Sequence, residues 1–256
     1  MRFIDAHAHL DEVERLEEVL SRAAGAGVVA IVTASSDAGS IAFSIEAQAR
    51  YREPRVLAAV GIHPWSLSEP GLDVEALLKL VRDKIGEAVA LGEVGLDYWL
   101  PEARRREEVR GLQREVFARQ LKIAKEVGKP VVVHSRGAWR DCLEMVKEAD
   151  VEALFHWFSG PLDVLRELLE CGYYISATPA IDYSQEHREA VKHAPLNRIL
   201  SETDSPVYYK GRFGRSAEPR DVVEVVDMLS KLKGVPLEGA AEACLSNAVG
   251  FYGLEA

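Results

Sequence analysis

The 256 residues predict an α/β fold, a (β/α)8 barrel, because short apolar runs and amphipathic helical segments alternate along the chain. Runs such as VVAIVTA and PVVVH recur about eight times. Runs that are apolar throughout are typical of strands buried on both faces, as in a parallel sheet. The alternation continues without a break in composition, and we therefore expect a single domain over residues 1–256.

The expected strands are the segments 2–7, 28–34, 55–62, 88–95, 130–134, 152–156, 172–177 and 198–204. Helical spacing of apolar residues is found in the segments 16–23, 77–81, 117–127, 161–169, 222–229 and 240–245. The clearest helix ends at Gly128, before Pro130 opens the next strand. A doubly wound open sheet is the alternative, but its first turn would be rich in glycine, and here that turn reads HAHLDE. The longest irregular stretch is expected at 204–219.

The net charge of −10 argues against tight, non-specific wrapping of long nucleic acid. It does not exclude an enzyme that binds one strand end at a cationic metal site. The three cysteines lie far apart without a CxxC pair, which favours buried thiols in a reducing compartment over disulfides. No apolar stretch resembles a membrane span or a signal peptide, so we expect a cytoplasmic protein with no membrane and no obligate protein partner.

Residues that bind metals recur where the expected strands end. They are His7, His9, Glu93, His134, His156 and Asp204. Functional groups of barrels gather at the carboxyl ends of the strands, so these side chains are expected on one rim. His7 and His9 are two apart on a strand and share a face. Glu93 can bridge two cations, because each carboxylate oxygen can bind one. The set predicts a centre of two divalent metal ions.

Each of these residues also has an ordinary explanation when it is taken alone. The HxH pair can be a polar pair in the core, Glu93 a buried ion-pair partner, and Asp204 the cap of a turn. Only their joint occurrence at five strand ends favours metal-assisted hydrolysis. Asp204 can then act as general base or serve only as a ligand. Asp5, Asp97 and Glu202 are candidates for orienting the ligands.

Six blocks in this order resemble the TatD family of metal-dependent deoxyribonucleases in the amidohydrolase superfamily. The blocks are DAHAHLD at 5–11, GIHP at 61–64, GEVGLDY at 92–98, VVVHSR at 131–136, FHWFSG at 155–160 and ETDSP at 202–206. The resemblance implies a TIM barrel. It also implies one metal at His7, His9, Glu93 and Asp204 and a second at Glu93, His134 and His156. Two positions depart from the family pattern, Trp157 and Ala217, and neither is an expected ligand.

Five residues are candidates for contact with substrate: His63, Arg136, Tyr208, Arg212 and Arg215. The resemblance implies that His63 contacts substrate and not metal, where it can donate a hydrogen bond or act as general acid. Arg136 is placed to bind a phosphate, or to form a salt bridge at the rim. The loop after Asp204 interleaves aromatic and cationic residues, a pattern that suits a single nucleic-acid strand, although a surface lid is an equal interpretation.

The resulting hypothesis is a hydrolase of ester bonds, a TatD-type deoxyribonuclease that shortens single-stranded DNA or RNA from the 3′ end with a hydroxide activated by two metal ions. Asp204, Glu93 and His63 are its expected catalytic residues. The first alternative is an amide or ester hydrolase, such as an aminoacyl-tRNA deacylase, because a barrel does not determine the reaction. The second is a binding barrel without activity. The histidines favour Zn²⁺ or Mn²⁺ by ligand type, and the resemblance favours Mg²⁺.

Overall fold

The computed structural model describes residues 1–68, 71–211 and 213–255. Eight parallel strands follow one another around a barrel in the order of the sequence. They are β1 (Phe3–Ala8), β2 (Val28–Ala34), β3 (Arg55–Val60), β4 (Ala90–Gly95), β5 (Val131–His134), β6 (Ala153–Phe155), β7 (Tyr174–Ala177) and β8 (Ile199–Ser201). A parallel bridge between Ala8 and Ser205 joins the first strand to the segment after the last. The prediction of a TIM barrel is confirmed, and the open sheet is excluded.

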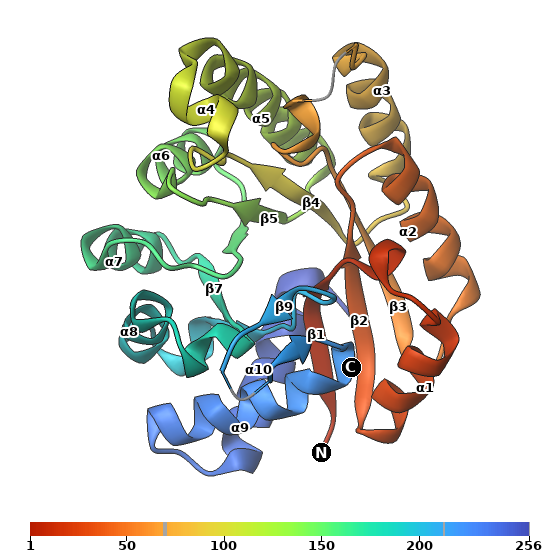
Figure 1. Ribbon diagram of the computed structural model, residues 1–256, viewed down its shortest axis with the longest axis vertical. Helices are drawn as coiled ribbons and strands as arrows, with labels where there is room; N and C mark the ends of the chain where they lie inside the picture. Colours follow the sequence, from red (N-terminus) through yellow and green to blue (C-terminus); the bar gives the residue numbers. More distant parts are fainter. Residues whose placement is uncertain (69–70, 212, 256) are drawn as a thin grey trace.

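Helices surround the strands (Figure 1). They are α1 (Leu16–Gly25), α2 (Ala38–Arg50), α3 (Val74–Lys84), α4 (Pro101–Arg105), α5 (Glu107–Val127), α6 (Trp139–Ala149), α7 (Leu162–Glu170), α8 (Gln185–His193), α9 (Val222–Lys233) and α10 (Leu237–Tyr252). Short 3-10 helices lie at Leu10–Glu12, Ser66–Ser68, Pro179–Asp182, Leu196–Arg198 and Pro219–Asp221. Helix α5 ends at Gly128, whose φ of 67° is the left-handed conformation that glycine adopts without steric cost. No helix in the described part of the chain is both long and apolar enough to cross a bilayer.

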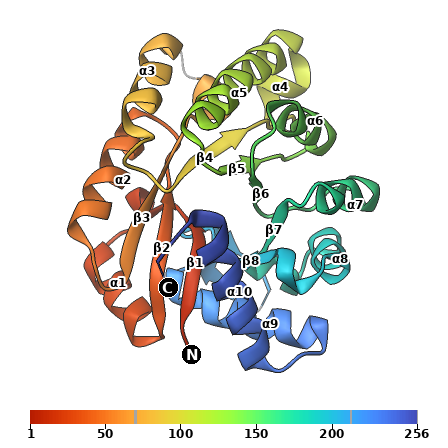
Figure 2. The same ribbon diagram turned by 180° about the vertical axis from the view of Figure 1, so that it is seen from behind.

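Alternate residues of the strands belong to two apolar clusters. In β3, Val56, Ala58 and Val60 pack in the cluster that includes the surrounding helices. Leu57 and Ala59 of the same strand pack in a second cluster with residues of other strands and of α10. Because side chains alternate between the faces of a strand, both faces of the sheet are apolar and buried. Figure 2 shows α10 across the middle of the molecule from behind, where it contacts β1 and β8.

The loop after β8 differs from its prediction as an irregular stretch. Residues Tyr208–Tyr209 form β9, which pairs antiparallel with β10, Arg215–Ser216. Tyr209 is fully buried, and its ring lies 5.3 Å from that of Trp157 and 6.3 Å from that of Phe213. The segment with alternating aromatic and cationic residues thus forms a small hairpin, and Tyr209 packs in an apolar cluster with Trp157 and Phe213.

Candidate metal centre

The barrel brings the six predicted ligand residues together at one rim. His7 lies in β1, Glu93 in β4, and His134 closes β5. The other three, His9, His156 and Asp204, come shortly after strands β1, β6 and β8. Five of the six residues are buried and His9 is partly exposed. This rim therefore holds a dense set of nitrogen and oxygen donors.

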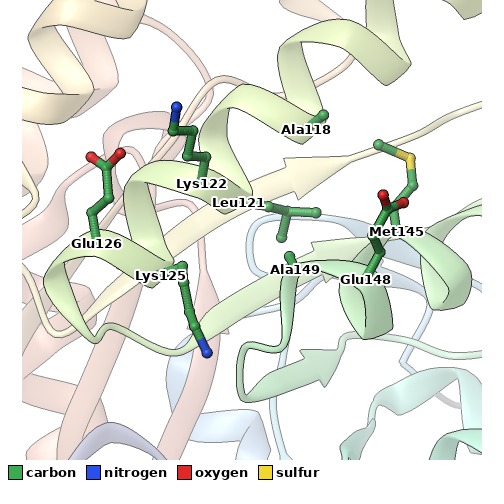
Figure 3. Close-up of a pocket in the computed structure, with 8 residues that line it drawn as sticks. All are labelled: Ala118, Leu121, Lys122, Lys125, Glu126, Met145, Glu148 and Ala149. Atoms are coloured by element: carbon green, nitrogen blue, oxygen red, sulfur yellow. The ribbon is translucent and has the colours of Figure 1, made fainter.

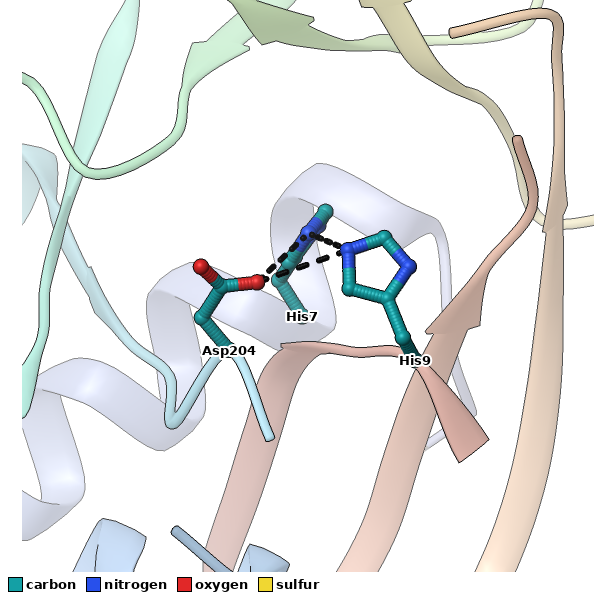
Figure 4. Close-up of side chains that lie close together, drawn as sticks. All are labelled: His7, His9 and Asp204. Carbon is teal, nitrogen blue, oxygen red and sulfur yellow. Dashed lines mark hydrogen bonds and ion pairs between the residues drawn. The ribbon is translucent and has the colours of Figure 1, made fainter. Parts of the chain in front are cut away.

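The first group of donors consists of His7, His9, Asp204 and one oxygen of Glu93. The two histidine Nε2 atoms are 3.3 Å apart. Each lies 3.3 Å from Glu93 Oε2 and 3.4 Å from Asp204 Oδ1. Figure 4 shows the imidazoles and the aspartate converging from separate segments. Ligands about 2.0–2.1 Å from a tetrahedral ion are about 3.3–3.4 Å from one another, so the spacing of these atoms fits a metal ion.

The second group gathers around the other oxygen of Glu93. Its Oε1 lies 2.7 Å from His134 Nδ1 and 2.7 Å from His156 Nε2. These two ring nitrogens are 3.5 Å apart. The two oxygens of one buried carboxylate thus face two separate sets of imidazole nitrogens, an arrangement that can hold two cations side by side.

Two carboxylates orient the histidines of the second group from outside. Asp97 Oδ2 is 2.9 Å from His134 Nε2, and Glu202 Oε1 is 3.2 Å from His156 Nδ1. A metal-binding histidine ordinarily donates its other ring N–H to such a carboxylate, which fixes the ring and its tautomer. Once deprotonated, the nitrogen of each histidine that faces Glu93 would be available to a metal ion.

Asp5 supports the ligand segments through their backbone and not through an imidazole ring. It accepts hydrogen bonds from the amide nitrogen of Thr203 at 2.8 Å and from its hydroxyl at 2.5 Å. Since Thr203 directly precedes Asp204, Asp5 anchors the backbone of that ligand segment, and its carboxylate also accepts a hydrogen bond from the backbone of His7. Burial raises the pKa of Asp5 well above its usual value, although the bonds from Thr203 oppose this.

The carboxylates and the imidazoles of the cluster stabilise one another's charged forms. Burial alone would raise the pKa of Glu93 and of Asp204. The surrounding histidines have the larger, opposite effect, so both pKa values are lowered. Conversely, burial lowers the pKa of His156, but Glu93 and Glu202 raise it well above its ordinary value. The carboxylates are therefore ionised, and the imidazoles take the positive charge that metal ions would otherwise supply.

His63 lies beside the second group and differs from the other histidines. Its Nε2 is 3.4 Å from Glu93 Oε1, and its Nδ1 accepts a hydrogen bond from the amide of Trp65 at 3.2 Å. Burial lowers its pKa to about 4. His63 is therefore neutral near pH 7, with its proton on Nε2, so that it can donate one hydrogen bond into the site.

The backbone is unusual at two places in the cluster. Asp204 has a φ of 49°, and Trp157, which follows His156, has a φ of 41°. Residues with side chains seldom adopt this left-handed region, although Asp and Asn do so more readily than others. Such conformations are held by surrounding structure and occur most often at functional sites. Here they turn the chain sharply where it leaves β6 and β8.

The residues predicted to contact substrate have different surroundings. The Arg136 side chain is partly exposed and bonds to Asp97 through Nε at 2.9 Å. Tyr208 is exposed on β9. Arg215, in contrast, forms a double hydrogen bond with buried Asp221 at 2.7 and 2.8 Å, which uses its guanidinium for structure. Arg212 lies outside the described residues.

Tyr183 is a rim residue that sequence reasoning missed. It is 40% exposed, and its pKa is raised by burial and by the charge of Asp204. Its ring lies 6.4 Å from that of Tyr209. Nothing in the local sequence connects Tyr183 with Asp204, because the two come from different loops that meet only in the folded barrel.

A surface groove between α5 and α6 is separate from the candidate metal centre. It is lined by Ala118, Leu121, Lys122, Lys125, Glu126, Met145, Glu148 and Ala149 (Figure 3). None of the six candidate ligands lines it, so the groove has no part in the chemistry of the rim.

The chain is similar to proteins that are described as metal-dependent hydrolases and deoxyribonucleases. A family model described as TatD related DNase matches residues 4–253. The Homo sapiens protein called deoxyribonuclease TATDN3 is 32% identical over 260 residues, which cover 97% of this chain and 94% of that protein. A metal-dependent hydrolase of Methanocaldococcus jannaschii is 28% identical over 255 residues, covering 98% of this chain and 97% of the relative.

Solved structures agree with this assignment. The Escherichia coli protein YjjV, described as a TatD homologue, superposes with a TM-score of 0.89 at 28% identity and covers 99% of each chain. A TatD family hydrolase of Entamoeba histolytica shares the fold, with a TM-score of 0.83 at 23% identity over 98% of each chain. With its barrel, its buried donor clusters and these similarities, the chain belongs to the TatD family of metal-dependent hydrolases within the amidohydrolase superfamily.

Proposed function

We propose that this protein is a two-metal phosphodiesterase that removes nucleotides from the 3′ end of single-stranded DNA or RNA. The observation that carries the proposal is the position of Glu93, whose Oε2 faces His7 and His9 at 3.3 Å while its Oε1 faces His134 and His156 at 2.7 Å. In this proposal His7, His9, Glu93 and Asp204 hold one divalent ion, and Glu93, His134 and His156 hold the other. Mg²⁺, Mn²⁺ and Zn²⁺ are the candidates.

The protein's own side chains have distinct tasks in this reaction. Two bound cations would activate water and neutralise charge on the scissile phosphate. Asp204 Oδ1 faces the histidines, while Oδ2 points away from them (Figure 4). We assign to Oδ2 the proton released when water attacks. Neutral His63 carries its proton on Nε2, from which it donates to a phosphate oxygen.

Three observations support nucleic acid as the substrate. Relatives at 32% identity are named as deoxyribonucleases. Arg136 presents a cation beside the second donor group, and guanidinium groups bind phosphate oxygens well. Exposed aromatic rings lie near the cluster or on the adjacent hairpin, in Trp65, Tyr183 and Tyr208. Such rings can stack on unpaired bases.

The first test uses purified protein with Mg²⁺, Mn²⁺ or Zn²⁺ and single-stranded DNA labelled at its 5′ end. We expect a ladder of shortened strands and the release of mononucleotides. Asp204→Asn should reduce the rate by about 10²–10⁴-fold, since an amide nitrogen replaces the proton-accepting oxygen and the negative charge of the first donor group is lost. Asn tolerates the left-handed backbone at this position, so the fold is retained. Asp83→Asn, on the surface of α3, is the matched control and should remain fully active.

The same samples distinguish the phosphodiesterase from the two alternative functions, an acyl hydrolase and a binding protein. An aminoacyl-tRNA and a simple aryl ester are offered in parallel with DNA. Cleavage of these acyl substrates without any strand shortening would replace the phosphodiesterase by an acyl hydrolase. Bound metal without turnover of any substrate would indicate a binding protein, and full activity of Asp204→Asn would remove the proposed mechanism.

A further inference from the structure

Trp65 is a partly exposed tryptophan that lies against the histidines of the rim. It follows the Gly-Ile-His-Pro turn after β3 and is 50% exposed. Its ring centroid is 5.0 Å from that of His63 and 6.1 Å from that of His134, in both cases edge to face. The exposed part of the indole therefore borders the second donor group.

A hydrogen bond to a buried carboxylate fixes the orientation of this indole. Trp65 Nε1 donates a hydrogen bond of 2.7 Å to Asp97 Oδ2, and Asp97 is fully buried. The same oxygen lies 2.9 Å from His134 Nε2. A single surface tryptophan needs no special explanation. This one is different, because the carboxylate that positions a candidate metal ligand also holds its ring in place.

Arg136 completes the surface. Its guanidinium carbon is 5.4 Å from the centre of the Trp65 ring, and its Nε bonds to Asp97 at 2.9 Å. Its Nη1 and Nη2 atoms have no hydrogen-bond partner among the residues that the structure describes. The guanidinium lies over the indole ring, so a half-exposed aromatic surface adjoins two cationic donors, a combination that matches an aromatic base attached to a phosphate.

We propose that Trp65 and Arg136 form a nucleotide subsite beside the metal centre, in which a base stacks on the indole and a phosphate binds the guanidinium. The identity of the ligand rests on the proposed function. The subsite selects a nucleotide over a bare sugar phosphate. Stacking of the base on the indole produces this selection. The metal centre does not contribute to it, because it would contact only the phosphate that both ligands share.

The test compares the binding of deoxyadenosine 5′-monophosphate and deoxyribose 5-phosphate to the Mn²⁺-loaded protein by calorimetry. The wild type should bind the nucleotide about tenfold more tightly, since base stacking is worth about 1–3 kcal/mol and 1.4 kcal/mol is tenfold. Trp65→Ala should bind both ligands equally. Trp65→Phe should retain most of the preference, because it keeps a stacking face but loses the bond to Asp97.

Trp99→Ala is the matched control. Trp99 is 49% exposed, but it packs against Trp139 at 5.7 Å and not against a candidate ligand. Its removal should leave the preference unchanged. Trp65→Leu serves as a second variant that keeps apolar volume without an aromatic face, and it should lose the preference as Trp65→Ala does. Thermal unfolding of each variant confirms that the fold is retained.

The outcomes separate the subsite from the nuclease. A tenfold preference in Trp65→Ala or Trp65→Leu would overturn the subsite, even if the wild type shortens DNA. A preference that depends on Trp65, in a protein that cleaves no strand, would support the subsite and refute the phosphodiesterase. Equal binding of both ligands by the wild type would also overturn the subsite.

Discussion

Asp97 connects the candidate metal centre with the half-exposed Trp65 and with Arg136. Its Oδ2 is the common partner of His134, Trp65 and Arg136, while its Oδ1 accepts hydrogen bonds from two backbone amides. Burial by itself raises the pKa of Asp97, but His134, Trp65 and Arg136 outweigh it and hold the pKa well below its usual range. The carboxylate is therefore charged at any pH at which the enzyme works.

Asp97→Ala should weaken the second metal site more than the first. His134 loses the acceptor that fixes its Nδ1 toward Glu93, and loss of such a partner costs about 10–100-fold in metal affinity. Equilibrium dialysis with Mn²⁺ should show one weakened site out of two. Asp141→Ala is the control, because Asp141 accepts a bond from Tyr98 at 2.7 Å and contacts no candidate ligand. Unchanged affinity in Asp97→Ala would show that Asp97 does not orient His134.

At the scale of elements, helix α8 connects two loops at the rim that carries the candidate ligands through one histidine. His187 is buried; its Nδ1 donates to the carbonyl of Phe158 at 2.8 Å, and its Nε2 accepts from the amide of Thr178 at 3.2 Å. Phe158 belongs to the loop after β6 and Thr178 to the loop after β7. A neutral imidazole is the one form that serves both contacts, and burial accordingly lowers the pKa of His187 to about 4.

This histidine should make the stability of the metal-free protein fall in acid. Its pKa is about 4 when folded and about 6.5 when unfolded, so the unfolded chain binds the proton first. Its contribution is fully present above pH 6.5 and is lost as the pH falls toward 4, by up to about 3 kcal/mol. Urea unfolding at a series of pH values should show a shallower loss in His187→Gln than in the wild type. Parallel curves would contradict this assignment.

The β9–β10 hairpin gives a second prediction at this scale. Arg215 was expected to bind substrate, but in the structure it pairs with buried Asp221 at the start of α9. Arg215→Ala should therefore destabilise the protein by about 1–2 kcal/mol, discounted for the partial exposure of the arginine, and leave KM for DNA unchanged. Denaturant titration and initial rates measure the two effects. A large rise in KM with unaltered stability would restore the role in substrate binding.

The whole molecule is a barrel whose rim concentrates like charges and depends on cations to balance them. Glu93, Asp204, Asp97 and Glu202 all lie buried within this one region. In the absence of metal their balance comes from protonated histidines, whose own burial disfavours the charge. We therefore expect metal binding and folding to be coupled across the barrel.

Removal of metal by a chelator should lower the thermal unfolding midpoint of the entire protein. A ligand that binds only the folded state stabilises it by about 4 kcal/mol at a thousand times its Kd. Calorimetry of the chelated protein, and of the same sample after Mn²⁺ is restored, measures the shift. Glu93→Gln should show a much smaller shift, because it weakens both donor groups. A midpoint that does not respond to metal in the wild type would contradict the coupling.

The sequence predicted those features that repeat or that occur at fixed positions relative to strands. All eight strands begin within about two residues of the expected segments, and the six ligand candidates meet because each lies in the carboxyl-terminal half of a strand or shortly after one. The partners of Asp5 and Arg215 and the burial of Tyr209 could not be predicted. They depend on contacts between loops, and neither periodicity nor spacing carries information about which loops touch.

The bridge between Ala8 and Ser205 closes the barrel beside the first donor group. The donors of this group can therefore meet only after the segment that follows β8 has been synthesised. His7 and His9 precede β2 in the chain, whereas Asp204 follows all eight strands and is therefore synthesised long after them. A nascent or truncated chain that stops before β8 carries the two histidines without the carboxylate that converges on them. The first donor group is thus complete only in a chain that extends through Asp204, and a chain that stops earlier lacks one of its carboxylates.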